Sequence, residues 1–100
     1  VHTGRLLNVT DDELSTIIAR ATATQNNDAL AVAAQLQRLR DAVDSIAYAI
    51  ECRAAALRRS ASTARADGDA TLALLDERNA NNAEHRATAL RERTGVARRT

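Results

Sequence analysis

The stretch that decides the fold is residues 28–65, DALAVAAQLQRLRDAVDSIAYAIECRAAALRRSASTAR, which contains no Pro and no Gly. Apolar residues recur in it three and four positions apart, the spacing of one face of an α-helix and of a coiled-coil seam. A helix of this length would be about 57 Å long at 1.5 Å per residue. The predicted packing seam, within the protein or between copies, comprises Val32, Leu36, Leu39, Val43, Ile46, Ile50 and Leu57.

The composition of the whole chain also favours helices. Its 100 residues contain 23 Ala, three Gly, no Pro and one aromatic residue, Tyr48. Ala is the best helix former, whereas strands favour β-branched and aromatic residues and turn-rich folds need Pro and Gly. We therefore predict an all-α protein.

Local signals divide the chain into three helices. Thr10 and Glu13 form a capping box, and Val9 and Leu14 are spaced as a hydrophobic staple, so a first helix is predicted over residues 11–24. An Asn at position 26 or 27 can cap a second helix over residues 28–65. The turn at residues 66–69 contains Gly68, and a third helix follows over residues 70–93.

Charge favours an antiparallel hairpin of the two long helices. The end of the second helix is basic and the start of the third is acidic, while the other two ends carry the opposite signs. An antiparallel arrangement brings each block opposite its complement, which favours one orientation although each surface pair contributes little. The prediction is one helical domain over residues 10–94, with flexible segments at 1–9 and 95–100.

The hairpin is expected to be completed by self-association. The first helix is too short to cover the whole apolar seam of the second. Small domains often depend on a further copy or a partner, and two hairpins can bury their seams as a four-helix bundle. We predict a coiled-coil-like dimer or tetramer that also contacts another protein.

Arg53 interrupts the apolar seam, and we therefore consider whether it fixes the register of the two long helices. In an antiparallel hairpin that turns near Gly68, Arg53 would lie opposite Asn82, with Asn79 and His85 within one turn. A polar layer of these side chains would fix the register, as single polar residues do in coiled coils. The alternative is that Arg53 extends its guanidinium into solvent.

No group of residues has the pattern of an active site. Cys52 lacks a neighbouring base, and His85 lacks further residues at metal-ligand spacing, so we predict neither catalysis, a metal nor a cofactor. Cys52 lies one helical turn after Tyr48, and this pair is expected to form a second contact face.

The charge balance limits the remaining functions. All 14 basic residues are Arg, and the net charge is +1. Arg-rich helix ends could contact phosphates, and the candidates are Arg58, Arg59, Arg98 and Arg99. No apolar run reaches the roughly 18 residues of a membrane span and only one Cys is present, so a cytoplasmic protein without a membrane partner is expected.

These features together predict a non-enzymatic helical module for protein–protein interaction, an oligomeric adaptor or a small structural component. The alternative is a small nucleic-acid-binding or regulatory protein that uses its Arg-rich helix ends. Frequent Ala and the use of Arg without Lys are typical of GC-rich genomes, which favours an actinobacterial or phage source.

Overall fold

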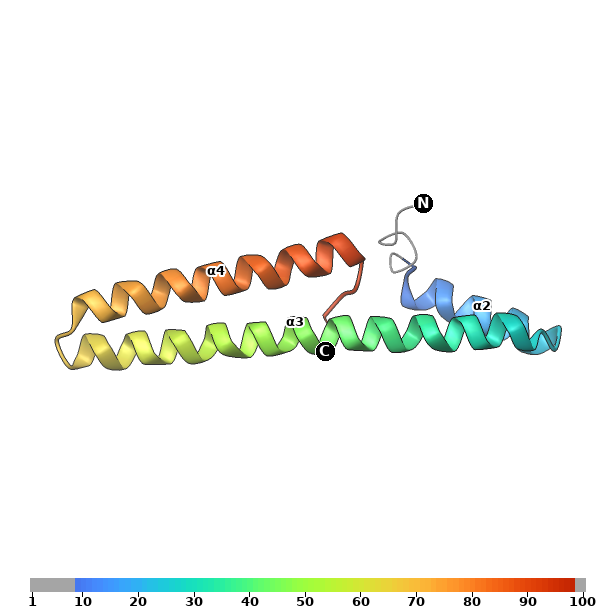
Figure 1. Ribbon diagram of the computed structural model, residues 1–100, viewed down its shortest axis with the longest axis horizontal. Helices are drawn as coiled ribbons and strands as arrows, with labels where there is room; N and C mark the ends of the chain where they lie inside the picture. Colours follow the sequence, from blue (N-terminus) through green and yellow to red (C-terminus); the bar gives the residue numbers. More distant parts are fainter. Residues whose placement is uncertain (1–8, 99–100) are drawn as a thin grey trace. The chain divides into compact units, whose positions relative to one another are not determined.

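The computed structural model describes residues 9–98 and is all-α (Figure 1). Its helices are α2 (Asp11–Ala23), α3 (Asn27–Ala66) and α4 (Ala70–Thr94), and the described residues contain no strand. Each bound lies within one residue of the prediction. The predicted short helix and long antiparallel hairpin are therefore confirmed.

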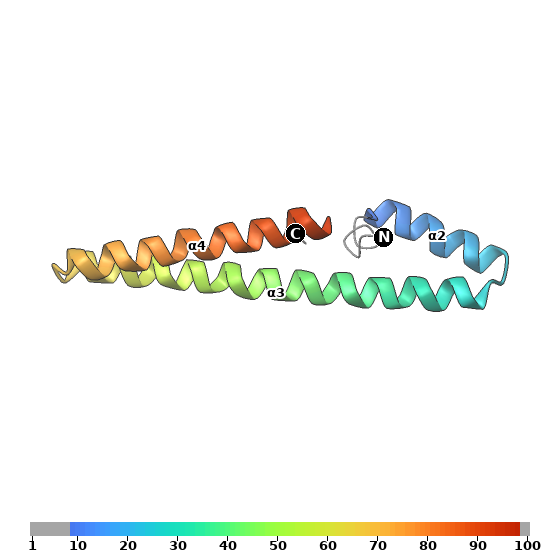
Figure 2. The same cartoon turned by 45° about the horizontal axis from the view of Figure 1, so that its top comes forward.

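Contacts divide the chain into two compact units, and α3 contributes to both. The first unit contains the chain up to Ser45 and again from Arg91 onward, and the second contains Ile46–Leu90. In the first unit α2 lies along the beginning of α3, and in the second α4 lies along the end of α3 (Figures 1 and 2).

The turn between α3 and α4 combines a helix stop with a helix start. Gly68 adopts a φ of 83°, and the amide of Asp69 donates to the carbonyl of Ala64 at 2.8 Å. This is a Schellman ending, which requires the left-handed backbone that Gly adopts without strain. The Asp69 side chain then accepts from the amide of Leu72 at 3.0 Å and caps α4.

The turn between α2 and α3 repeats this design without a glycine. Gln25 takes the left-handed position with a φ of 55°, and the amide of Asn26 donates to the carbonyl of Ala21 at 2.9 Å. The Asn26 side chain accepts from the amide of Ala29 at 3.1 Å, so Asn26 caps α3. At the start of α2, Thr10 accepts from the amide of Glu13 at 3.1 Å, as the predicted capping box requires.

The core of the second unit consists of alanine. Its buried clusters are Ala54 with Ala80 and Ala83, and Ala61 with Ala64 and Ala73. Ile50 and Leu57 are only partly buried beside the first cluster. Alanine side chains on both helices permit a close approach of the two backbones. Each buried methyl contributes only about 0.8 kcal/mol, against about 1.5–3 kcal/mol for a fully buried Leu or Ile.

Polar contacts along one edge of the hairpin fix its antiparallel orientation. Arg58 pairs with Glu84 at 2.6 Å and donates to Asn81, and Arg65 pairs with Glu77. The Arg65 hydrogen bond holds the pKa of the Glu77 carboxyl below its usual value. The contact of Arg65 with Glu77 joins the basic end of α3 to the acidic start of α4, as the charge pattern predicts.

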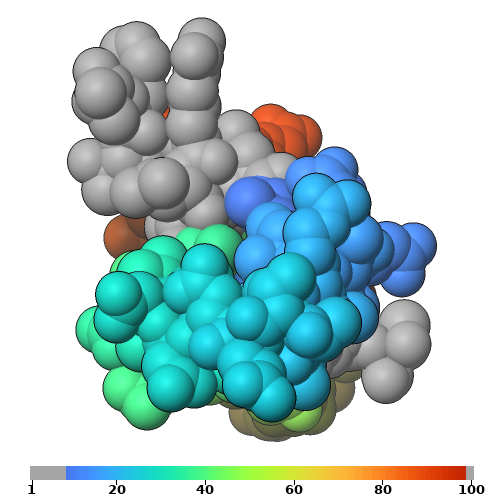
Figure 3. Space-filling model, turned by 90° about the vertical axis from the view of Figure 1, so that its right-hand side faces the viewer, coloured from blue at the N-terminus to red at the C-terminus, as the bar shows by residue number. Residues whose placement is uncertain are grey.

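The first unit buries Leu14 and Ala21 of α2 and Ala33 of α3. Figure 3 shows α2 and the beginning of α3 side by side at this end. Two other buried residues of the unit are Val96, which lies in the segment predicted to be a flexible tail, and Arg40. Residues 1–8 of the predicted flexible N-terminal segment lie outside the described residues.

Because the core of the second unit consists of alanine, we predict that a larger side chain at one of these positions destabilises the protein. Ala54→Leu should lower the free energy of unfolding by about 1–3 kcal/mol, because Ala54 is fully buried between α3 and α4. Ala55→Leu at the exposed neighbouring position should change it by less than about 0.5 kcal/mol. Urea denaturation measures both variants, and equal effects would contradict the alanine contact.

Candidate interaction surface

The side chains of α3 that matter for packing lie in three rows along the helix. Within each row, successive residues are seven positions apart. The alanine row is Ala33, Arg40, Ala47, Ala54 and Ala61, and all five are buried. The shared row, which belongs to both possible packing seams of α3, is Leu36, Val43, Ile50 and Leu57, and all four are half-buried. The aliphatic row is Val32, Leu39 and Ile46, which are 68%, 49% and 55% exposed.

The predicted seam joined the shared row to the aliphatic row, whereas the protein packs the shared row with the alanine row. The reason lies in the second half of α3, where the aliphatic row continues as Arg53 and Ser60. The alanine row continues there as Ala54 and Ala61, and α4 presents buried Ala80 to it. Of the seven predicted seam residues, Ile50 and Leu57 therefore flank the hairpin core of the second unit. Leu36 and Val43 are half-buried in the first unit, and the other three are exposed.

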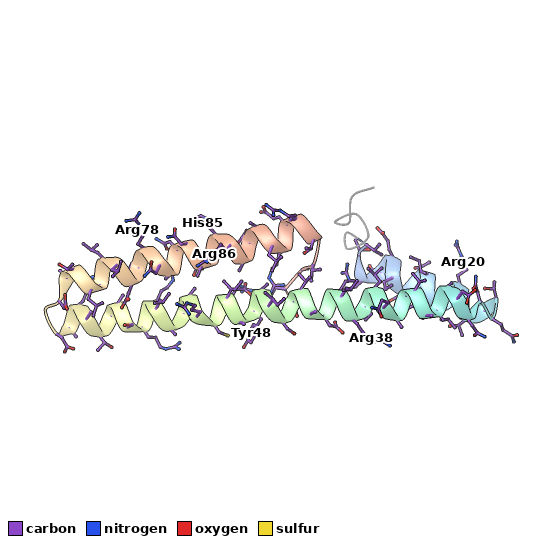
Figure 4. All side chains as sticks on the ribbon, in the orientation of Figure 1. Arg20, Arg38, Tyr48, Arg78, His85 and Arg86 are labelled. Atoms are coloured by element: carbon purple, nitrogen blue, oxygen red, sulfur yellow. The ribbon has the colours of Figure 1, made fainter. Side chains whose placement is uncertain are left out.

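The residues of the predicted polar layer do not come together in the core. Arg53, Asn79, Asn82 and His85 are all exposed. Figure 4 shows His85, with Arg78, on the side of α4 that is turned away from α3. Arg53 belongs to the continuation of the aliphatic row, next to the buried Ala54, which explains its exposure.

Polar side chains enter the packing of α3 at two other places. Arg40 pairs with Asp11 at 3.1 Å and donates to the carbonyl of Val9 in the first unit. In the second unit, buried Asp76 accepts from the Ser60 hydroxyl at 2.6 Å. Sequence analysis missed both contacts. The signal that could have found Arg40 is its place in the seven-residue repeat of Ala33, Ala47 and Ala54.

A second contact along the edge of α3 lies at the end of α4. Arg91 pairs with Asp44 at 2.7 Å, and both side chains are mostly buried. This pair belongs to the first unit and lies near the buried Thr94 and Val96. It joins the basic end of α4 to the acidic part of α3, as the charge pattern also predicts.

An open apolar groove lies between α2 and α3 in the first unit. Its volume is about 460 Å³, and its apolar lining includes Leu14, Ile17, Val32 and Leu36. Asn26 and Asp28 provide the polar part of the lining. Val32 of the aliphatic row thus lines a concave apolar surface.

In the second unit, α4 also exposes large apolar side chains. Leu72, Leu74 and Leu75 are all exposed, although they lie in the first two turns of a helix whose buried residues are mostly Ala. The small buried residues of α4 and its large exposed residues therefore repeat the distribution found on α3.

Tyr48 and Cys52 lie on the outside of α3, consistent with their assignment to a separate face. Both are exposed, and Tyr48 is turned away from α4 in Figure 4. A hydrogen bond with Cys52, together with the charge of that side chain, raises the pKa of the Tyr48 phenol above its usual value. The hydrogen bond favours the neutral phenol that donates it, and a negative charge nearby disfavours the phenolate.

The four Arg residues considered for nucleic-acid binding differ in their surroundings. Arg58 is held by Glu84 and Asn81, so a phosphate would have to compete with a carboxylate for it. Arg59 is exposed, and so is Arg98. Arg99 lies outside the described residues. Nucleic-acid binding through this set stays a prediction.

Within residues 9–98, no three His, Cys, Asp or Glu side chains gather as a metal site. None of the described helices is long and apolar enough to cross a membrane. Comparison with protein-family models, with curated proteins and with solved structures finds no match to this chain. The geometry of the exposed aliphatic surface is therefore the basis for a functional proposal.

The contact between Tyr48 and Cys52 predicts an unusual phenol titration. Because Tyr48 is the only Tyr and the chain has no Trp or Phe, absorbance in the long-wavelength phenolate band, where a thiolate does not absorb, reports its ionisation alone. The midpoint of the phenol titration should be higher in the native protein than in Cys52→Ala, which lacks the sulfur. A midpoint unchanged by Cys52→Ala would show that the two side chains do not interact.

Proposed function

We propose that this chain is a non-enzymatic helical interaction module, an oligomeric adaptor or small structural component. Its aliphatic row, Val32, Leu39 and Ile46, is buried against a helix of another protein molecule. A further copy of the chain is the first such partner, and the completed assembly is a helical bundle.

One observation carries the proposal, namely that the small residues are inside and the large apolar residues are outside. Among residues 9–98, the buried hydrophobic residues are Ala apart from Leu14 and Val96, and nine large apolar side chains are exposed. A helix with three apolar positions per heptad is typical of a bundle, in which it contacts more than one neighbour. Water-exposed Leu and Ile forgo about 1.5–3 kcal/mol each that burial would provide.

If copies of the chain associate, the stability of the protein should depend on the protein concentration and on the side chain of Leu39. The melting temperature should rise with protein concentration over about a hundredfold range, because assembly stabilises the folded state by mass action. Leu39→Ser should destabilise the assembly by about 1.5–3 kcal/mol, because Leu39 becomes buried in it. Ala34→Ser introduces the same residue at an exposed position of α3 outside the aliphatic row, so it is the control and should have little effect.

Calorimetry over the dilution series, combined with the solution mass from light scattering, measures these effects. A single-chain mass and an unchanging melting temperature, with Leu39→Ser as mild as Ala34→Ser, would contradict the proposed assembly.

A further inference from the structure

We propose that the aliphatic row of α3 pairs antiparallel with the same row of a second copy, with Asp28 of each copy facing Arg53 of the other. This inference deepens the proposed function and rests on it, because it names the partner, the orientation and the register. It places the two-fold axis between Arg40 and Asp41 of the two α3 helices.

The face of α3 that carries the aliphatic row alternates large and small side chains. Ala42 follows Leu39 by three positions, Ala49 follows Ile46 by three, and both alanines are exposed. Residues three apart on a helix are neighbours on one face. The exposed face therefore contains large side chains next to small ones along α3.

Two such faces interlock in an antiparallel pair when a residue of one copy faces the residue of the other copy whose number brings the sum of the two to 81. Leu39 of one copy then meets Ala42 of the other, and Val32 meets Ala49. Large side chains opposite small ones fill the space between two helices without overpacking. Ile46 meets Gln35, whose aliphatic stem extends across it.

The same register brings together two charges that form no ion pair with any other residue in the described part of the chain. The side chains of Asp28 and Arg53 are exposed, and neither makes an ion pair within residues 9–98. By contrast, Asp44 and Arg58 on the same helix are both engaged in ion pairs. The two-fold symmetry would form the contact between Asp28 and Arg53 twice, once at each end of the paired segment.

Charge also excludes the competing arrangements. A parallel pair in register would place Asp28 against Asp28 and Arg53 against Arg53, and like charges disfavour such contacts. An antiparallel pair shifted by one heptad keeps large opposite small but moves Arg53 to Gln35. Of these arrangements, only the proposed register brings Asp28 next to Arg53. These two residues therefore determine which register the dimer adopts.

The test measures dimer dissociation constants by sedimentation equilibrium for Asp28→Arg, Arg53→Asp, the double variant and the native protein. Each single variant should weaken the dimer by about tenfold or more, because two attractive contacts become repulsive. The double variant should regain the native constant within about threefold. Arg59→Asp changes the charge equally at an exposed position outside the face and should have little effect.

Mixing the two single variants provides a second measurement that needs no double substitution. In the antiparallel register each contact of the mixed dimer pairs one Arg with one Asp, so the mixture should associate as tightly as the native protein. Single variants as tight as the native dimer, with a mixture tighter still, would indicate the parallel arrangement and overturn the inference.

The two proposals fail in different ways. A native protein that sediments as a single chain would overturn both the assembly and its register. An oligomeric native protein whose dissociation constant does not respond to Asp28→Arg or Arg53→Asp would overturn the register alone and leave the proposed function standing.

Discussion

The close contact of Ala54 and Ala61 in the alanine row of α3 with the alanines of α4 is the constraint on which the rest of the protein depends. Ala54 and Ala80 allow the two backbones to approach, and this approach leaves no room for Leu or Ile between them. Ile50 and Leu57 of the shared row are therefore held at the edge of the contact. The aliphatic row is excluded from it and remains exposed.

This arrangement gives one helix two faces that pack in different ways. The inner face consists of methyl groups and is flanked by polar contacts such as the one between Arg58 and Glu84. The outer face, with Leu39 and Ile46, has the larger apolar side chains. The proposed function follows from this division, because the inner face forms the fold and the outer face is available to a second molecule.

The helices and their antiparallel order were predictable from sequence because local signals determine them. The Thr10 cap and the Gly68 turn are such signals. The rotation of α3 was not predictable, because the shared row belongs to both possible seams and hydrophobicity favours the larger side chains. The burial of Arg40 also escaped prediction, since its partner Asp11 is distant in sequence and belongs to another helix.

The most direct test of which row of α3 faces α4 is the rate of thiol labelling at two adjacent positions. Ile46→Cys and Ala47→Cys would be compared in a Cys52→Ser background, at a dilution where the chain is monomeric. The account predicts that the thiol at position 46 reacts nearly as fast as in the unfolded chain, while the one at position 47 is protected. Protection at 46 with rapid reaction at 47, or equal rates, would contradict it.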